Sequence, residues 1–394
     1  MFAFVLAATV TFGAASSQAG YTMKVNDNSW ISLGIGMRAH LGAQQTTTSD
    51  GWEKSLAFDN GRIYINGGIM EGLTFEFNTD VTNNGTGGNV KDVVMLDAIA
   101  KFAFSDAFNI WAGRLLPPSD RANLSGPYFL NTWNFPAGGT FGPHRYTSIH
   151  AGRDDGAAIW GQFQGGKFKY QVGVFQGNDN SESPNFAARL TLNLLDPEPG
   201  YYNSSTYFGT KDIFAIGVVY QVQSGGADSA AVAGIPEVPE VPYSAGPPVV
   251  VPVAFMPAVP GVAATSGSFS GWNVDILFEK NLGDSTGTVT LDGAVYGYSN
   301  DAGLGAGASD GLGFFTLGGF MLPGKVGVGP FKGNPQATIR YEQYQDDISD
   351  VRGKRIDAAL NWILDGHNAY LTLNYGKVLD TDQQEIILGM QFQY

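Results

Sequence analysis

The stretch ISLGIGMRAHLGA, residues 31–43, alternates between apolar and small or polar side chains at every position. Leu33 and Ile35 belong to one set, and Arg38 and His40 belong to the other. Because successive side chains of a strand point to opposite sides, the stretch predicts a strand with one apolar and one polar face. Soluble sheets use strands of about five or six residues, whereas a tilted strand needs roughly nine to eleven residues to cross a bilayer. These 13 residues therefore favour a transmembrane strand.

The composition agrees with a closed barrel of such strands. The 394 residues include 54 glycines and no cysteine, with 43% hydrophobic and only 15% charged residues. The mean hydropathy is −0.06, and no window of about twenty apolar residues occurs, which excludes membrane-spanning helices. A β-barrel hides its apolar content in alternation. The lack of cysteine also excludes a disulfide scaffold and a thiolate metal site.

The opening pattern recurs along the whole chain. Together with residues 31–43, the repeats give 16 alternating segments. The repeats are residues 61–67, 73–81, 94–104, 108–115, 157–163, 168–175, 186–195, 213–222, 272–280, 288–298, 312–321, 337–344, 355–364, 369–375 and 385–394. Short turns join several of them, and longer connections alternate with the short ones. The sequence thus predicts an all-β, 16-stranded antiparallel transmembrane barrel.

The alternation also predicts which side chains point outward. We expect an apolar outer face in contact with lipid and a polar inner face around a lumen. The residues expected to face lipid include Ile31, Leu33, Ile35, Phe75, Phe77, Leu190, Leu192, Ile386 and Leu388. Three connections on the short-turn side, near residues 195–211, 280–287 and 321–335, are longer than such turns usually are.

Both chain ends carry signals of their own. Residues 1–19 read as a secretory signal peptide with cleavage after Ala19, so we expect the barrel to comprise residues 20–394. No lysine or arginine precedes Lys24, which indicates either a start further upstream or a trimmed sequence. At the other end, residues 386–394 alternate outward and finish on Tyr394. This ending resembles the signature by which the outer-membrane assembly machinery recognises Gram-negative barrels.

With its 16 strands and its long third loop, the chain resembles the Gram-negative outer-membrane porin superfamily, of the trimeric general-diffusion and phosphate-selective type. The resemblance implies short periplasmic turns, long extracellular loops and a homotrimer in contact with lipid and lipopolysaccharide. It implies a water-filled channel for passive diffusion of small hydrophilic solutes and ions. No enzymatic activity, cofactor or nucleic-acid partner is expected. The four histidines show no metal-ligand spacing, so no metal site is expected either.

The third loop, residues 117–153, is the segment that such barrels fold into the lumen. It contains acidic and basic residues among prolines and aromatic rings, and opposed charges at a constriction sort solutes by charge and dipole. The candidate pore residues on this loop and the inner wall are Arg38, His40, Arg62, Glu76, Asp97, Lys101, Asp120, Arg121, Arg145, Arg153, Arg189 and Arg340. Because acids and bases are mixed, strong phosphate selectivity is not expected.

A proline-rich extracellular loop is expected at residues 223–268. Its segment 235–260 contains eight prolines, which exclude helix interior and central strand and favour an extended loop. Its apolar residues suit a contact with a neighbouring barrel, lipopolysaccharide or a surface protein. A variable, solvent-exposed insertion explains them equally well.

Three other classes of protein remain open. A surface adhesin, or a barrel that sheathes a partner protein, would share the strand pattern. An outer-membrane barrel hydrolase is a further alternative, although such barrels usually have fewer strands. A secreted two-sheet β protein would place the apolar faces in an interior. Conductance in planar bilayers discriminates among these classes.

Overall fold

The computed structural model describes residues 20–46, 49–83, 91–136, 152–177, 181, 183–225, 267–301, 310–347 and 352–394. The expected signal peptide, the proline-rich segment 235–260 and Arg145 lie outside these residues.

The described residues form 17 strands and four short helical segments. The first nine strands are β1 (Tyr21–Lys24), β2 (Trp30–Thr46), β3 (Ser49–Met70), β4 (Leu73–Asn83), β5 (Lys91–Ser105), β6 (Phe108–Leu115), β7 (Asp154–Phe163), β8 (Phe168–Phe175) and β9 (Asn185–Asn193). The others are β10 (Ile213–Gln223), β11 (Phe269–Asn281), β12 (Thr288–Asn300), β13 (Gly311–Met321), β14 (Asn334–Asp346), β15 (Arg352–Asp365), β16 (Ala369–Val378) and β17 (Gln384–Gln393). The helical segments are α1 (Arg121–Ser125), η1 (Pro127–Phe129), η2 (Gln164–Gly166) and η3 (Gly329–Phe331).

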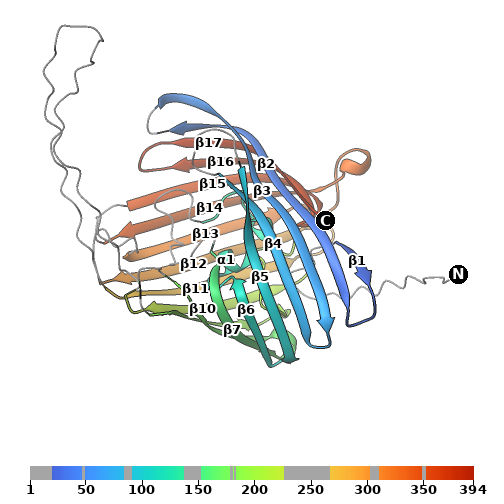
Figure 1. Ribbon diagram of the computed structural model, residues 1–394. Helices are drawn as coiled ribbons and strands as arrows, with labels where there is room; N and C mark the ends of the chain where they lie inside the picture. Colours follow the sequence, from blue (N-terminus) through green and yellow to red (C-terminus); the bar gives the residue numbers. More distant parts are fainter. Residues whose placement is uncertain are drawn as a thin grey trace, which may run out of the picture.

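Strands β2 to β17 form one closed antiparallel barrel (Figure 1). Each strand pairs with the next along the chain, and β17 returns to pair with β2, with Gln393 opposite Gly36. Strand β1 pairs only with the start of β2 and adds no member to the wall. The predicted 16-stranded barrel is therefore confirmed, and each predicted segment falls on one wall strand. Among the described residues, no helix has the length and apolar character to span a membrane, a finding without bearing on spans made of strands.

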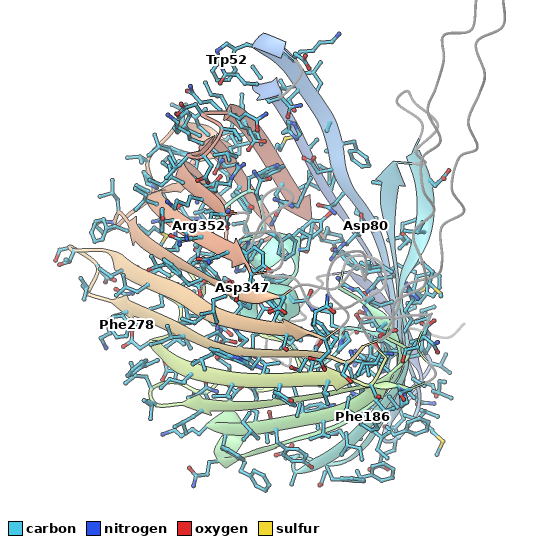
Figure 2. The ribbon with its side chains drawn as sticks, turned by 90° about the vertical axis from the view of Figure 1, so that its left-hand side faces the viewer. Trp52, Asp80, Phe186, Phe278, Asp347 and Arg352 are labelled. Carbon is cyan, nitrogen blue, oxygen red and sulfur yellow. The ribbon has the colours of Figure 1, made fainter. Side chains whose placement is uncertain are left out.

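One predicted boundary is wrong. The predicted segments 31–43 and 61–67 leave a long connection between them, with residues 44–59 as a loop, but β2 continues to Thr46 and β3 already begins at Ser49. Trp52, Leu56 and Phe58 continue the apolar outward positions of the strand. The charged Lys54 occupies the outward position between Trp52 and Leu56, so the alternation is difficult to recognise in the sequence. The β2–β3 hairpin consequently extends beyond its neighbours, with Trp52 near its tip (Figure 2).

The two faces of the wall differ as the alternation predicts. Ile35, Leu190 and Leu388 are each more than half exposed on the outer face. Arg189 and Arg340 on the inner face are 1% exposed. Figure 2 shows Phe186 and Phe278 on the outside of the barrel. The outer face is thus a continuous apolar surface, and the polar groups are gathered in the lumen.

The connections alternate between the two ends of the barrel. At one end, here the turn end, β3–β4, β5–β6 and β15–β16 are joined by two or three residues. The other end, here the loop end, bears the connections after β6 and β10, which are the longest in the chain. Among the described residues, two connecting segments turn inward: residues 116–136, the loop-end insert, and residues 194–212, the turn-end insert. Their buried side chains fill much of the lumen.

Candidate functional site

The loop-end insert crosses the lumen and packs on the opposite wall. Gly126 has a φ of 65°, a left-handed conformation that lets the chain reverse between α1 and η1. Tyr128 is completely buried, with the Arg62 guanidinium 4.9 Å above its ring. The guanidinium of Arg38 lies 4.0 Å from the Trp133 ring and donates to the Trp133 carbonyl oxygen at 2.7 Å. Aromatic rings and wall arginines therefore fix this insert inside the barrel.

The turn-end insert enters from the other side and is bound as firmly. The Tyr201 ring stacks on Trp111 of β6 with 4.6 Å between centroids. Lys169 of β8 donates to the Gly200 carbonyl at 3.0 Å and to Asn203 Oδ1 at 2.7 Å. These wall partners compensate for much of the cost of burying the polar groups of this insert.

Strand β11 supplies a further anchor for the turn-end insert. The carboxylate of Glu279 accepts from Thr206 Oγ1 at 2.6 Å and from the Gly209 main-chain N–H at 2.8 Å. The Tyr207 main-chain N–H also donates to it at 3.0 Å. One buried carboxylate thus gathers the end of the insert onto the wall.

The two inserts are joined by a buried ion pair. Arg121 donates through Nη1 and Nη2 to the two carboxylate oxygens of Glu198, at 2.7 and 2.8 Å. Burial alone would raise the pKa of Glu198, but the charge and hydrogen bonds of Arg121 outweigh it and lower that pKa from 4.5 to about 2. Arg121 Nη1 also donates to the Ser204 carbonyl at 2.7 Å. The Ser205 N–H donates to the Phe129 carbonyl at 3.1 Å, which adds a main-chain link.

His367, in the turn between β15 and β16, contacts both inserts. Its Nδ1 lies 3.1 Å from the Tyr128 carbonyl oxygen, and its Nε2 lies 2.9 Å from that of Thr206. The ring is enclosed by Phe129 and Phe208, with centroids 4.6 and 4.7 Å away. Burial lowers the pKa of His367 from 6.5 to about 4, although the two carbonyl oxygens favour its protonated form. The ring is therefore neutral near pH 7.

A small cavity of about 40 Å³ remains between the inserts and strands β3 to β5. Its lining combines charged wall residues with apolar residues of the inserts: Arg62, Glu76, Asn78, Asp97, Leu116, Leu124, Ser125, Gly126, Phe129, Arg153 and Tyr202. Two guanidinium groups and two carboxylates therefore border the same small space. Such a space acts on the charge and the dipole of a solute that enters it.

The charges around the cavity are held in fixed positions. Arg153 Nε donates to Asp97 Oδ1 at 3.0 Å. Asn78 Nδ2 lies 2.7 Å from Glu76 Oε1 and 3.0 Å from Asp97 Oδ2, and Lys101 pairs with Glu76. Glu76 and Asp97 thus both accept from the Asn78 amide, and each pairs with its own cation, Lys101 or Arg153. This arrangement keeps both signs of charge at the cavity wall.

The structure divides the predicted pore residues into two groups. Arg62, Glu76, Asp97 and Arg153 line the cavity, with Lys101 beside them. Asp120, Arg121, Arg189 and Arg340 hold the inserts instead. Asp120 accepts from Tyr296 at 2.7 Å, Arg189 donates to Asp275 at 2.8 Å and to the Ser119 carbonyl at 3.0 Å, and Arg340 donates to Asp357 at 2.8 Å and to Thr132 at 2.6 Å. Arg38 contacts Trp133, and His40 lies further along β2 toward the loop end.

This division corrects one expectation and shows what sequence reasoning missed. Arg121 was expected to act as a constriction charge, but Glu198 neutralises it, and Asp275 lies 3.7 Å away. The turn-end insert, with the cavity residue Tyr202, was not anticipated. Its only signal was the length of the connection at residues 195–211, which exceeds that of an ordinary turn.

Comparison with known proteins gives a likeness of fold. No family model matches the sequence, and no curated protein matches it. Among solved structures, the chain is similar to an anion-selective porin from Comamonas acidovorans, with 12% identity, a TM-score of 0.55, and coverage of 93% of this chain and 100% of that one. It is similar to OmpF of Salmonella typhi in complex with daunomycin, with 11% identity, a TM-score of 0.55, and coverage of 95% and 100%. OmpT of Vibrio cholerae, in trimer form, gives 11% identity, a TM-score of 0.52, and coverage of 93% and 100%. The chain thus shares the closed 16-stranded barrel of these outer-membrane proteins.

Proposed function

We propose that the protein is an outer-membrane porin that lets small hydrophilic solutes and ions diffuse across the membrane. The continuous apolar outer face suits lipid contact, since a charged side chain at the bilayer midplane costs about 2 to 4 kcal/mol. A barrel of this strand number is too wide for its own side chains to fill. The cavity along β3 to β5, with both signs of charge, is the observation that carries the proposal.

The two inserts define the character of this channel. The loop-end insert contacts β2, β3 and β14, and the turn-end insert contacts β6, β8 and β11. Solutes would therefore pass through the space that the inserts leave beside Arg62 and Asp97. The path is narrow because it is restricted from both ends of the barrel. Mixed charge predicts weak preference between cations and anions and good passage of small polar or zwitterionic solutes.

The assembly is part of the same proposal. We infer a homotrimer in the bacterial outer membrane, in contact with lipid and lipopolysaccharide, because an OmpT structure of this fold is a trimer. Cross-linking in native membranes tests this inference. A cross-linked species of three chains supports it, and a single-chain species alone contradicts it.

Planar-bilayer recording tests the channel directly. The full-length protein, refolded in detergent and added at low concentration, should produce discrete conductance steps. Liposome swelling should admit a monosaccharide and exclude a trisaccharide. A folded barrel without conductance would favour an adhesin or a partner-sheathing barrel.

A further inference from the structure

A serine, a histidine and an aspartate lie in hydrogen-bonding contact in the wall formed by β2 and β3. The Ser55 hydroxyl is 2.8 Å from His40 Nε2, and His40 Nδ1 is 2.7 Å from Asp59 Oδ2. The His40 side chain is 9% exposed and that of Asp59 is 24% exposed, while Ser55 is half-buried. We propose that Ser55, His40 and Asp59 form a nucleophilic site that transfers the acyl group of a carboxylic ester to water.

The order of the three groups suits this chemistry. When His40 carries its proton on Nδ1, that N–H donates to Asp59, and the lone pair of Nε2 accepts the Ser55 hydroxyl proton. The carboxylate therefore fixes the tautomer in which the ring is a base toward the serine. Trp133 presents its ring edge-on to His40, with 6.5 Å between centroids, and limits rotation of the imidazole.

A β-bulge places the aspartate. Arg38 is opposite Asn60, but the next residue of β2, Ala39, is opposite Phe58, so Asp59 is one residue in excess. Asp59 meets His40 while Asn60 meets Arg38 at 3.1 Å, and two consecutive side chains thus point into the lumen. A regular strand cannot do this, because its side chains alternate. Bulges that re-aim a side chain are frequent beside active sites.

The strand that carries Ser55 has an open edge. Pairing between β3 and β4 begins only at Tyr64, so in the described residues the part of β3 from Ser49 to Asn60 pairs with β2 alone. Figure 2 shows this end of the hairpin standing apart from β4. The open edge gives an ester a route to Ser55 from the side, in addition to the lumen.

The same edge supplies a main-chain donor. Ile35 exchanges main-chain hydrogen bonds of 2.7 and 2.8 Å with Tyr394, the residue after β17. The residues of β2 that alternate with Ile35, Gly42 among them, therefore turn their main-chain N–H and C=O groups toward β3. Ser55 is opposite Gly42, so the main-chain groups of Ser55 bond to β2. The main-chain N–H of the next residue, Leu56, therefore points away from β2 toward the open edge. An N–H on the residue after the nucleophile is positioned to donate to an oxyanion.

The reaction balances with water as the second substrate. Ser55 Oγ attacks the ester carbonyl carbon while its proton passes to His40 Nε2, and the Leu56 N–H donates to the resulting oxyanion. The carbon–alkoxide bond then breaks, and the leaving alkoxide takes the proton from Nε2. Water attacks the acyl-serine with the same base, which releases the carboxylic acid and restores Ser55.

Covalent labelling of the intact barrel tests the site. The refolded full chain is treated with a fluorophosphonate, and the modified residue is identified by mass spectrometry. Hydrolysis of p-nitrophenyl acetate and of phosphatidylcholine in mixed micelles is measured in parallel, so that a soluble ester and a membrane lipid are distinguished as acyl source. The variants are Ser55→Ala, Asp59→Asn and, as a matched control, Ser32→Ala on the lumen face of β2.

The expected result is a single adduct on Ser55 that is lost in S55A and retained in S32A. We expect D59N to slow labelling and hydrolysis at least about tenfold, because it removes the carboxylate that fixes the tautomer. The single-channel conductance of S55A should equal that of the parent, so failure of this site and failure of the channel are distinguishable. No adduct, an adduct elsewhere, or parental rates in S55A or D59N would overturn the proposal.

Discussion

The loop-end insert and the turn-end insert occupy the same lumen but are held there by different means. The loop-end insert, rich in proline and aromatic residues, lays Tyr128 and Trp133 on the wall. Gly389 lets Trp133 approach closely, since a Cβ at that position would lie 2.6 Å from the indole ring. The turn-end insert combines the stacking of Tyr201 on Trp111 with two buried carboxylates, Glu198 of the insert and Glu279 of the wall. A barrel can thus be narrowed from both ends, by inserts that combine aromatic packing and buried polar contacts in different ways.

Removal of the turn-end insert is the strongest way to test this comparison. Replacing residues 198–208 by a four-residue Gly-Ser linker should raise single-channel conductance by roughly twofold or more, because the barrel itself leaves a wide aqueous lumen. The matched control shortens the turn at residues 322–333, where Val328 is 85% exposed and Phe331 is 69% exposed. Unchanged conductance in a correctly folded variant would show that the insert does not restrict the path.

The difference between the inserts also explains what could be predicted from the sequence. The strands were predictable because every wall strand has one apolar outer face and one polar lumen face, and this difference produces alternation in the sequence. The loop-end insert was expected because Tyr128 and Trp133 need an apolar surface. The turn-end insert also contains aromatic residues, Tyr201 and Tyr202 among them, but it lies at the end of the barrel where short turns are expected. Its burial depends on partners far away in the sequence. Glu198 finds Arg121 77 positions earlier, a pairing that only the closed barrel creates.

The candidate sites show the same limit at the level of single residues. The alternation correctly placed Arg62, Glu76 and Asp97 on the lumen side of the wall. It could not distinguish a charged residue that lines the cavity from one that holds an insert. His40 was predicted as a wall residue. Its contact with Asp59 depends on a bulge, and a bulge leaves no mark in the alternation that a reader of the sequence can detect.

The ion pair between the inserts provides the second test. Arg121→Gln leaves the Glu198 carboxylate buried without its cation, and breaking a buried pair in this way destabilises by about 3 to 5 kcal/mol. We expect a lower unfolding temperature in detergent and a conductance between those of the parent and the linker variant. Arg121→Gln combined with Glu198→Gln should recover part of the lost stability, because no unpaired charge remains. An R121Q variant as stable as the parent would mean that packing alone holds both inserts.

Acid should loosen the turn-end insert selectively. The pKa of Glu198 is about 2 in the folded protein and 4.5 as its ordinary value, so its contribution is present above pH 4.5 and is lost as the pH falls toward 2. The shift corresponds to roughly 3 kcal/mol. The unfolding temperature of the parent should therefore fall more steeply over this range than that of Glu198→Gln. His367 remains in both proteins, so its titration cancels in the comparison, and parallel curves would contradict the prediction.

The smallest effect concerns the charged residues that line the cavity. In water, a unit charge about 6 Å from a passing ion contributes roughly 0.7 kcal/mol, which is about a threefold change in relative permeability. Arg153→Gln should shift the reversal potential in a salt gradient toward cations, and Asp97→Asn should shift it by a similar amount toward anions. Lys332→Gln, in the exposed turn at residues 322–333, is the control and should leave the potential unchanged. Because Arg153 lines the cavity and Arg121 does not, R121Q should change selectivity less than R153Q does. The reverse order would place the selectivity charges at the junction of the inserts, and the cavity along β3 to β5 would not be the path.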